Sequence, residues 1–275
     1  MATVYVGTSG WYYDHWEGVL YPPRLPKGKR LDLYLQRYNS VELNVTYYRV
    51  PGPATFEGWY RKAPPGFVYV AKAHREITHD RKLRDCAEPV ARLHEAVAPL
   101  GEKLGCILFQ VPPSLHKNLP LLEEFLAILP PGRRYAIEFR HPSWECDEVF
   151  GVLRKAGVAH VVVSRVRYPF AEAHTAPFAY YRLHGPDKLC GSPYAEPWLA
   201  ELAGKLARLA AQGAPSFTFF NNDIAGHAVR NADTLNEHLA RLGIRRSALG
   251  PWGDSEQEPL LLGNGHGEAV HRRGD

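Results

Sequence analysis

Residues 135–144 read YAIEFRHPSW and join an apolar strand pattern to a run of ionisable side chains. Because successive side chains of a strand point to opposite faces, Ile137 and Phe139 share one face, whereas Glu138 and Arg140 share the other. The apolar face fits a hydrophobic core, and the polar residues come at the end of the stretch. The pattern therefore predicts a buried strand that brings a carboxylate and a guanidinium to a site at its C-terminal end.

Similar short apolar runs recur along the chain. Together with the opening stretch they cover residues 4–7, 41–44, 68–74, 106–110, 135–140, 159–164, 179–184 and 217–222. Most are followed by helix-like stretches such as LPLLEEFLAIL and EPWLAELAGKLARLAAQG, several of which end at Gly, a common helix stop. Strands that alternate with helices indicate βαβ units and a parallel sheet. Eight such units predict an α/β fold, a closed (β/α)₈ TIM barrel.

One connection departs from this pattern. The stretch RVRYPFAEAHTAP, which follows the sixth strand, has no helical periodicity, so the sixth α unit is expected to be irregular. An open doubly wound sheet is the alternative architecture, but no G-x-G-x-x-G sequence opens a helix. We therefore expect a single-domain barrel over residues 1–245. Residues 246–275 are polar, Gly-rich and without periodicity, which predicts a flexible C-terminal tail.

The composition limits the class of protein. The chain has 275 residues, 45% of them hydrophobic, and a net charge of +4, far from the strongly basic surface of a dedicated nucleic-acid binder. The N-terminus lacks the apolar run of a signal peptide, and no stretch approaches the roughly 20 apolar residues that span a bilayer. The four cysteines are far apart and form no Cys-x-x-Cys pair. These features indicate a cytoplasmic protein with reduced cysteines and no membrane partner.

The two-residue period of a strand also selects polar side chains near the ends of other strands. In barrel enzymes the active site lies at the C-terminal end of the strands. We therefore expect one pocket to be built from Glu42, Lys72, Glu138, Arg140, Arg182 and His184. In such a pocket the two carboxylates can hold the lysine and one arginine, which leaves a guanidinium free to bind an anion.

This set suggests roles in catalysis. Glu42, Glu138, Lys72 and His184 are the candidate acid–base residues, while Arg140 and Arg182 are expected to orient an anionic substrate. The alternative is a structural ion-pair network that fills the lumen, although the cations outnumber the two carboxylates. We favour a salt bridge for Lys72 over a Schiff base with substrate. Replacement of Arg182 by Met is expected to remove anion binding and to leave the fold intact.

Further residues are expected to contact substrate. They are His141, Gln110, Asn44, His74, Asn222, Trp11 and Tyr47. The aromatic rings after the first two strands either stack on a sugar or an extruded base, or plug the mouth of the barrel or hold long loops. For the sequence FFNND we expect Asn222 to lie at the rim and Asp223 to cap the following helix.

No cofactor is predicted. A divalent metal is an alternative, and its ligands would come from His74, His141, His184, Glu42, Glu138 and Asp223. No short H-E-x-x-H spacing supports it, and the nearby lysine and arginines would repel a dication.

Seven motifs spread over about residues 4–240 resemble a known family. They are VGTSGWYYDHWEGVLYP, VELNVTYYRVP, AKAHREITH, LFQVPPS, IEFRHPSW, YYRLHG and FFNND. In this order they are similar to the domain-of-unknown-function 72 family, the YecE-like proteins. The resemblance implies a TIM barrel. The family has been grouped with sugar-isomerase-like barrels and compared with endonuclease-like barrels that act on damaged DNA, and neither comparison identifies a reaction.

The residues and the resemblance together favour an enzyme. Its expected substrate is a small, polar, anionic molecule such as a sugar acid or phosphorylated sugar. One alternative is a metal-dependent, endonuclease-like enzyme that processes DNA, which would make a nucleic acid the partner. The other is a barrel that binds a metabolite without catalysis. The oligomeric state stays open.

Overall fold

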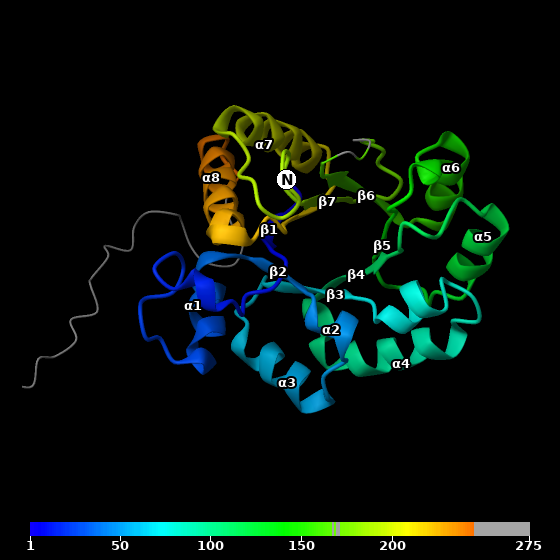
Figure 1. Ribbon diagram of the computed structural model, residues 1–275, viewed down its shortest axis with the longest axis horizontal. Helices are drawn as coiled ribbons and strands as arrows, with labels where there is room; N and C mark the ends of the chain where they lie inside the picture. The colour runs from blue at the N-terminus through cyan, green and yellow to red at the C-terminus, as the bar shows by residue number, and fades with distance from the viewer. Residues whose placement is uncertain (167, 169–170, 245–275) are drawn as a thin grey trace, which may run out of the picture.

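The computed structural model describes residues 1–166, 168 and 171–244. Its eight parallel strands form one sheet in the order β1-β8-β7-β6-β5-β4-β3-β2, which curls into a barrel surrounded by helices (Figure 1). The strands are β1 (Val4–Thr8), β2 (Ser40–Leu43), β3 (Val68–Lys72), β4 (Leu104–Gln110), β5 (Tyr135–Glu138), β6 (Ala159–Ser164), β7 (Ala179–Leu183) and β8 (Ser216–Phe220). The predicted TIM barrel is confirmed.

The α-helices follow the strands and cover the outside of the barrel. They are α1 (Arg30–Arg37), α2 (Val45–Tyr48), α3 (Pro53–Lys62), α4 (Ala87–Val97), α5 (Leu119–Ala127), α6 (Asp147–Ala156), α7 (Glu196–Ala211) and α8 (His227–Arg241). Within its described residues, the connection from β6 to β7 contains no helix, which confirms the irregular sixth unit. Short helical turns complete the connections: η1 (Asp14–Trp16), η2 (Lys27–Lys29), η3 (Glu76–Asp80), η4 (Ala98–Lys103), η5 (Pro142–Trp144) and η6 (Ile224–Gly226).

The helix ends follow local chemistry, as α6 illustrates. It begins with Asp147 and Glu148, whose charges suit the positive end of the helix dipole, and it ends with Arg154 and Lys155. Gly157 then adopts a φ of 66°, a left-handed conformation that stops the helix and turns the chain into β6. The connection from α6 to β6 is therefore short.

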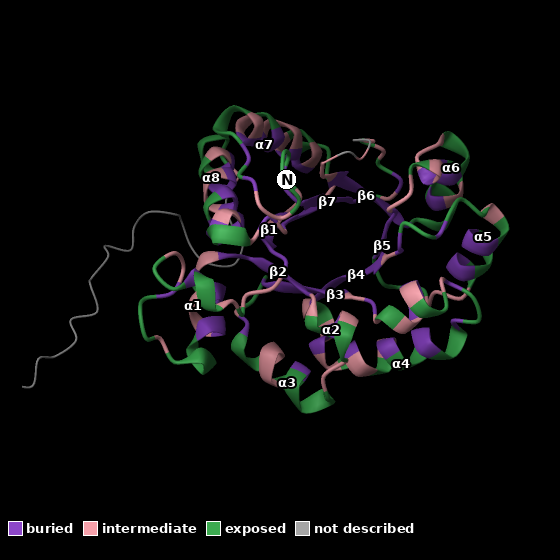
Figure 2. Cartoon of the chain, in the orientation of Figure 1, coloured by how far each residue is buried: buried purple, intermediate pink, exposed green. Residues whose placement is uncertain are grey.

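The barrel has two apolar cores on opposite sides of its wall. Ile107 and Ile137 point outward and are buried under the helices, whereas Leu108, Tyr180 and Phe217 fill the lower lumen. Figure 2 shows the ring of buried strands inside the more exposed helices. Complete burial of a leucine, isoleucine or phenylalanine side chain stabilises the fold by roughly 1.5–3 kcal/mol. The lower lumen is therefore packed with apolar and aromatic side chains.

Side chains close the barrel where β1 meets β2. Apart from a single bridge between Ser9 and Glu42, the two strands form no ladder. The Asn39 amide replaces it, because its Oδ1 accepts from Val6 N and its Nδ2 donates to the Val4 carbonyl, each at 2.9 Å. A Cβ atom at position 7 would lie 2.0 Å from the Ser40 carbonyl oxygen, so only glycine allows this approach.

Three further expectations concern the strand ends, membrane-spanning helices and the C-terminal tail. Several strands end one or two residues earlier than predicted: β3 ends at Lys72 and β5 at Glu138. None of the helices in the described ranges is both long and apolar enough to cross a bilayer. The predicted tail, residues 246–275, lies outside the described residues.

Candidate active site at the barrel mouth

Glu42 lies at the barrel mouth near the end of β2 and is completely buried. Arg182, on β7, binds it through two atoms: Nη2 donates to Oε1 at 2.6 Å and Nε donates to Oε2 at 2.9 Å. Ser9 Oγ and Tyr180 OH donate to the same oxygens at 2.8 Å and 2.7 Å. Because a carboxylate offers about four acceptor positions, Glu42 has little capacity left for another donor.

Glu138, at the end of β5, is the second buried carboxylate and joins the two arginines. Its Oε2 accepts from Arg182 Nη1, and its Oε1 pairs with Arg140 Nε. Burial by itself raises the pKa of a carboxyl group, but the charges of Arg140 and Arg182 outweigh burial and hold the pKa of Glu138 far below its usual value. Glu138 is therefore ionised and a weak base.

His184 follows β7 and is buried beside Arg140. Arg140 Nη2 donates to His184 Nε2 at 3.2 Å, which puts the proton of the neutral imidazole on Nδ1. Asn221 Nδ2 lies 3.0 Å from Nδ1, and Nδ1–H donates to Asn221 when the amide is turned so that its oxygen faces the ring. Burial, aided by the charge of Arg182, holds the pKa of His184 well below its usual value. His184 is therefore neutral and helps to orient Arg140.

Lys72 is placed differently from the expectation. The carboxylates hold both arginines, and Lys72 makes no ion pair within the described ranges, so the predicted salt bridge is wrong. The reason is geometric: one planar guanidinium, that of Arg182, reaches Glu42 and Glu138 at once, which leaves no carboxylate for the ammonium.

The surroundings of Lys72 are aromatic. Its Nζ lies over the Tyr47 ring, 4.3 Å from the centroid, and His79 packs edge-on against that ring at 5.1 Å between centroids. Burial, aided by the charge of Arg182 and opposed by the two carboxylates, lowers the pKa of Lys72 to about 8. Below, Tyr47, Lys72 and His79 are called the Lys72 corner, and Glu42, Glu138, Arg140 and Arg182 are called the Arg182 network.

Other predicted site residues are distributed unevenly. Gln110 ends β4 beside Glu138 in register, so it lies at the mouth. His74 lies beyond the end of β3 and lines a separate cavity near α4, because the chain leaves the barrel after Lys72. His141 stacks on His116, with 3.8 Å between centroids, and caps η5.

The end of β8 also differs from expectation. Asn222 is completely buried, and its Nδ2 donates to Ser192 O at 2.9 Å and to Asn231 Oδ1 at 2.8 Å, so it does not lie at the rim. The Asp223 side chain caps no helix. It accepts from Trp16 Nε1 at 2.6 Å and pairs with His15.

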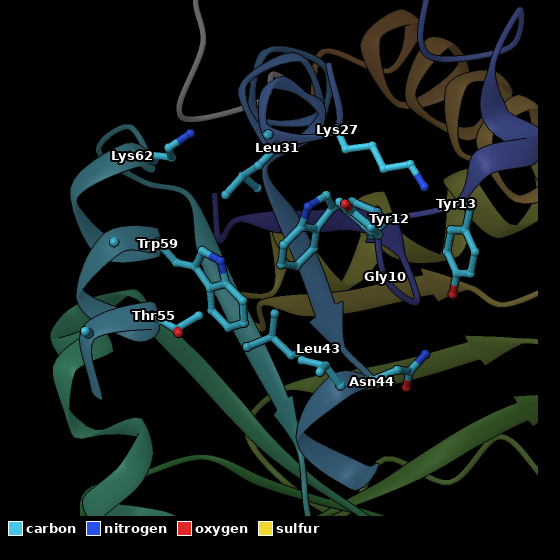
Figure 3. Close-up of a pocket in the computed structure, with 15 residues that line it drawn as sticks. Gly10, Tyr12, Tyr13, Lys27, Leu31, Leu43, Asn44, Thr55, Trp59 and Lys62 are labelled. Atoms are coloured by element: carbon cyan, nitrogen blue, oxygen red, sulfur yellow. The ribbon is translucent and has the colours of Figure 1, made fainter. Parts of the chain in front are cut away.

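Trp11 and Asn44 line a cavity outside the barrel wall, between α1 and α3. The cavity has a volume of about 570 Å³, and Figure 3 shows Tyr12, Trp59 and Lys27 among its lining residues. Trp11 meets Trp59 edge-on with 5.3 Å between ring centroids. Trp11 therefore packs beside α3 and outside the lumen, and its expected contact with substrate stays a prediction.

The candidate metal ligands are not assembled. Glu42 and Glu138 bind arginine, His184 lies 3.8 Å from Glu138 Oε1 but faces Arg140, and His74, His141 and Asp223 lie on separate loops. Within the part of the chain that the structure describes, no three His, Cys, Asp or Glu side chains are grouped so as to hold a metal ion.

The expected pocket set left out several residues at the mouth, although strand periodicity identifies them. Asn221 lies two positions after Phe219 of the lumen core, so it shares the lumen face that Asn222 does not. Arg165 likewise lies two positions after Val163, and its buried Nε has no hydrogen-bond partner among the described residues. By the same rule Tyr180 precedes Arg182 on the lumen face of β7.

Comparisons with known proteins support the architecture. Residues 5–253 match the family described as "Protein of unknown function DUF72". The UPF0759 protein YunF of Bacillus subtilis (strain 168) is 24% identical over 292 residues, which cover 90% of this chain and 98% of that protein. The UPF0759 protein YecE of Escherichia coli (strain K12) is 28% identical over 144 residues, or 51% of this chain. That match spans 50% of the length of YecE.

Two crystal structures of DUF72 family proteins have the same fold. The one from Thermotoga maritima MSB8 has a TM-score of 0.79 and 31% identity, and the match covers 86% of this chain and 99% of that one. The one from Enterococcus faecalis V583 has a TM-score of 0.76 and 20% identity, over 86% of this chain and 96% of that one, and is similar in fold alone. Because the family match covers nearly the whole chain, this protein belongs to the DUF72 family, whose function is unknown.

Proposed function

We propose that the barrel mouth is the active site of an enzyme that acts by acid–base chemistry on a small, polar, anionic substrate, such as a sugar acid or phosphorylated sugar. The site lies at the C-terminal ends of β2, β5 and β7, the end of a barrel that carries the active site in enzymes of this fold.

The observation that carries the proposal is excess positive charge. Four cations, Lys72, Arg140, Arg165 and Arg182, are grouped with two carboxylates, Glu42 and Glu138, which gives 4 − 2 = +2 for this set. His184 is neutral and adds no charge to this sum. A buried site with uncompensated positive charge favours an anion, because the dielectric constant there is lower than in water.

The geometry also supports different roles for these residues within the site. Both carboxylates are occupied by arginine, so they position guanidinium groups and do not act as bases. Lys72 has no anionic partner in the described ranges and a pKa of about 8, which suits proton transfer near neutral pH. In this scheme Arg140 and Arg165 hold the anion while Lys72 accepts or donates the proton.

Anion binding can be measured by thermal unfolding. Phosphate, sulfate and glycolate should each raise the melting temperature above that in chloride at equal ionic strength. Lys72→Met and Arg140→Met should weaken this stabilisation by at least about tenfold in apparent affinity, which corresponds to about 1.4 kcal/mol. Lys103→Met is the control, because Lys103 donates to the carbonyls of Tyr60 and Ala63, away from the mouth. Equal loss in all three variants would contradict the proposal.

Catalysis needs a separate measurement. Proton NMR in D₂O, with small sugar acids and sugar phosphates as substrates, should show exchange or loss of a carbon-bound proton that depends on Lys72. Binding without exchange or turnover for any anion tested would favour a metabolite-binding barrel over an enzyme.

A further inference from the structure

We propose that the Lys72 amine forms an imine with its substrate, so that the substrate is an anionic carbonyl compound, such as an oxo acid or the open-chain form of a sugar acid or sugar phosphate. The inference rests on the proposed function of the same site. It adds a covalent step and a substrate class.

The placement of Lys72 distinguishes it from lysines that have acceptors. Lys27 and Lys62 bind Asp14 and Asp32 at 3.1 Å and 2.7 Å, respectively. Lys103 also lies over a tyrosine ring, 4.4 Å from its centroid, but donates to two backbone carbonyls. Among the described residues Lys72 has no hydrogen-bond acceptor or ion-pair partner, only the Tyr47 ring. No carboxylate or carbonyl therefore has to be released before its nitrogen reacts.

The amine is also available near neutral pH. Burial lowers the pKa of Lys72 to about 8, from 10.5 for an ordinary lysine. At about pH 7.5 this leaves roughly a quarter of the amine unprotonated, compared with roughly one molecule in a thousand for an ordinary lysine. Only the unprotonated amine has the lone pair that attacks a carbonyl carbon.

The chemistry balances without another reactant. The Lys72 nitrogen forms a bond to the carbonyl carbon, the carbonyl oxygen gains a proton, and the nitrogen loses one. The resulting carbinolamine then loses water, and a carbon–nitrogen double bond forms. His79 is suited to carry the protons, because burial and the charge of Lys72 lower its pKa and keep it neutral. The protonated imine withdraws electrons from the neighbouring carbon, which favours proton removal or carbon–carbon cleavage there.

The surrounding charges select the carbonyl compound. Arg140 is partly buried, with 12% of its side chain exposed, and the Arg165 guanidinium acts on it electrostatically. These groups favour a carbonyl substrate that carries a carboxylate or phosphate over a neutral aldehyde of the same size.

Reductive trapping tests the imine on the unaltered protein. The protein is incubated with glyoxylate and cyanoborohydride at about pH 7.5, and modified lysines are identified by mass spectrometry of its peptides. Lys72 should be modified at least about tenfold faster than Lys103, with a rate that saturates as glyoxylate increases. Glycolaldehyde, which is neutral, should modify Lys72 more slowly than glyoxylate and without saturation.

Variants separate this inference from the proposed function. Lys72→Arg keeps the positive charge and should retain anion stabilisation while it loses trapping at position 72. If Lys72 in the unaltered protein is modified no faster than Lys103, the imine is refuted, whereas anion binding measured by thermal unfolding still supports the proposed function. If anions do not bind, the proposed function fails whatever the trapping result.

Discussion

The Arg182 network and the Lys72 corner both lie at the barrel mouth, but their buried charges are stabilised in opposite ways. In the Arg182 network, Arg182 is 1% exposed and each neighbouring carboxylate is 0% exposed, and all are paired. In the Lys72 corner an ammonium lies against an aromatic ring with no anion beside it. The first arrangement is complete without a ligand, whereas the second leaves charge uncompensated.

This difference distinguishes the paired charges of the Arg182 network, which are part of the structure, from the unpaired charge of Lys72, which is available to react. A buried pair adds little net stability, but removal of one partner leaves an unpaired charge in a dry site. An unpaired lysine is destabilised in its charged form, which is why its pKa falls. The expected responses to mutation therefore have opposite signs in the two regions.

The largest effect is expected for Arg182→Met. The change leaves Glu42 and Glu138 buried without their shared cation, which should lower the free energy of unfolding at neutral pH by about 3–5 kcal/mol. This replaces the expectation that the variant keeps its fold stability. In the parent protein the pKa of Glu138 is depressed, so its stabilising contribution is present above 4.5 and is lost as pH falls through the depressed value. The difference between the two proteins, measured by urea denaturation, should therefore shrink in acid.

Arg30→Met is a matched control for Arg182→Met. Arg30 is also 1% exposed, but its partners Asp14 and Glu17 are 69% and 45% exposed and can be solvated by water. Arg30→Met should lower the free energy of unfolding by less than half as much as Arg182→Met, because it leaves no buried carboxylate unpaired. Equal costs in the two variants would mean that packing of the arginine stem, and not charge, dominates the network.

A pH-dependent effect is expected for Lys72→Met. Lys72 faces the cations Arg140 and Arg182 and both carboxylates, and its folded pKa of about 8 lies below 10.5. Between these values the unfolded chain binds more protons, so the stability of the parent protein rises with pH in this window. Lys72→Met lacks this pH-dependent contribution to the free energy of unfolding. Relative to the parent protein it should be most stabilised below about pH 8, and this advantage should shrink by up to about 3 kcal/mol by pH 10.5.

Denaturant unfolding of both proteins across this pH range measures the difference directly. Other groups that titrate in alkali are common to both and cancel. A constant difference between the two stability curves would show that Lys72 has an ordinary pKa.

The smallest effect is expected for Tyr47→Leu. Loss of the ring removes a cation–π contact with Lys72 worth about 0.5–2 kcal/mol and should lower the pKa of Lys72 further. The pKa can be followed by NMR of isotopically methylated lysines. Tyr60→Leu removes the equivalent ring from Lys103 and should leave the Lys72 resonance unchanged. A higher pKa of Lys72 in Tyr47→Leu would mean that the ring acts mainly by excluding water.

Strand periodicity predicted much of the site because it depends only on local geometry. The alternation around Glu138 placed it and Arg140 on the lumen side, and the same rule finds Arg165 and Asn221. The rule failed after β3, although it held for Arg140, Arg165 and Asn221, which also lie just past the ends of their strands. His74 is in phase with Lys72, but it lies beyond the end of β3 and lines the separate cavity near α4. It therefore does not lie in the pocket where it was predicted.

The sequence alone determined the eight strands, the irregular sixth unit and the polar character of the mouth, because these follow from residue type and from periods of two or 3.6 residues. Only the tertiary structure decided which charges are paired. Lys72 and Arg182 have the same sign and similar positions at strand ends, so nothing local distinguishes them. The distinction comes from partners more than 100 residues away in sequence, since Arg182 reaches Glu42 (|i−j| = 140) and thereby leaves Lys72 unpaired.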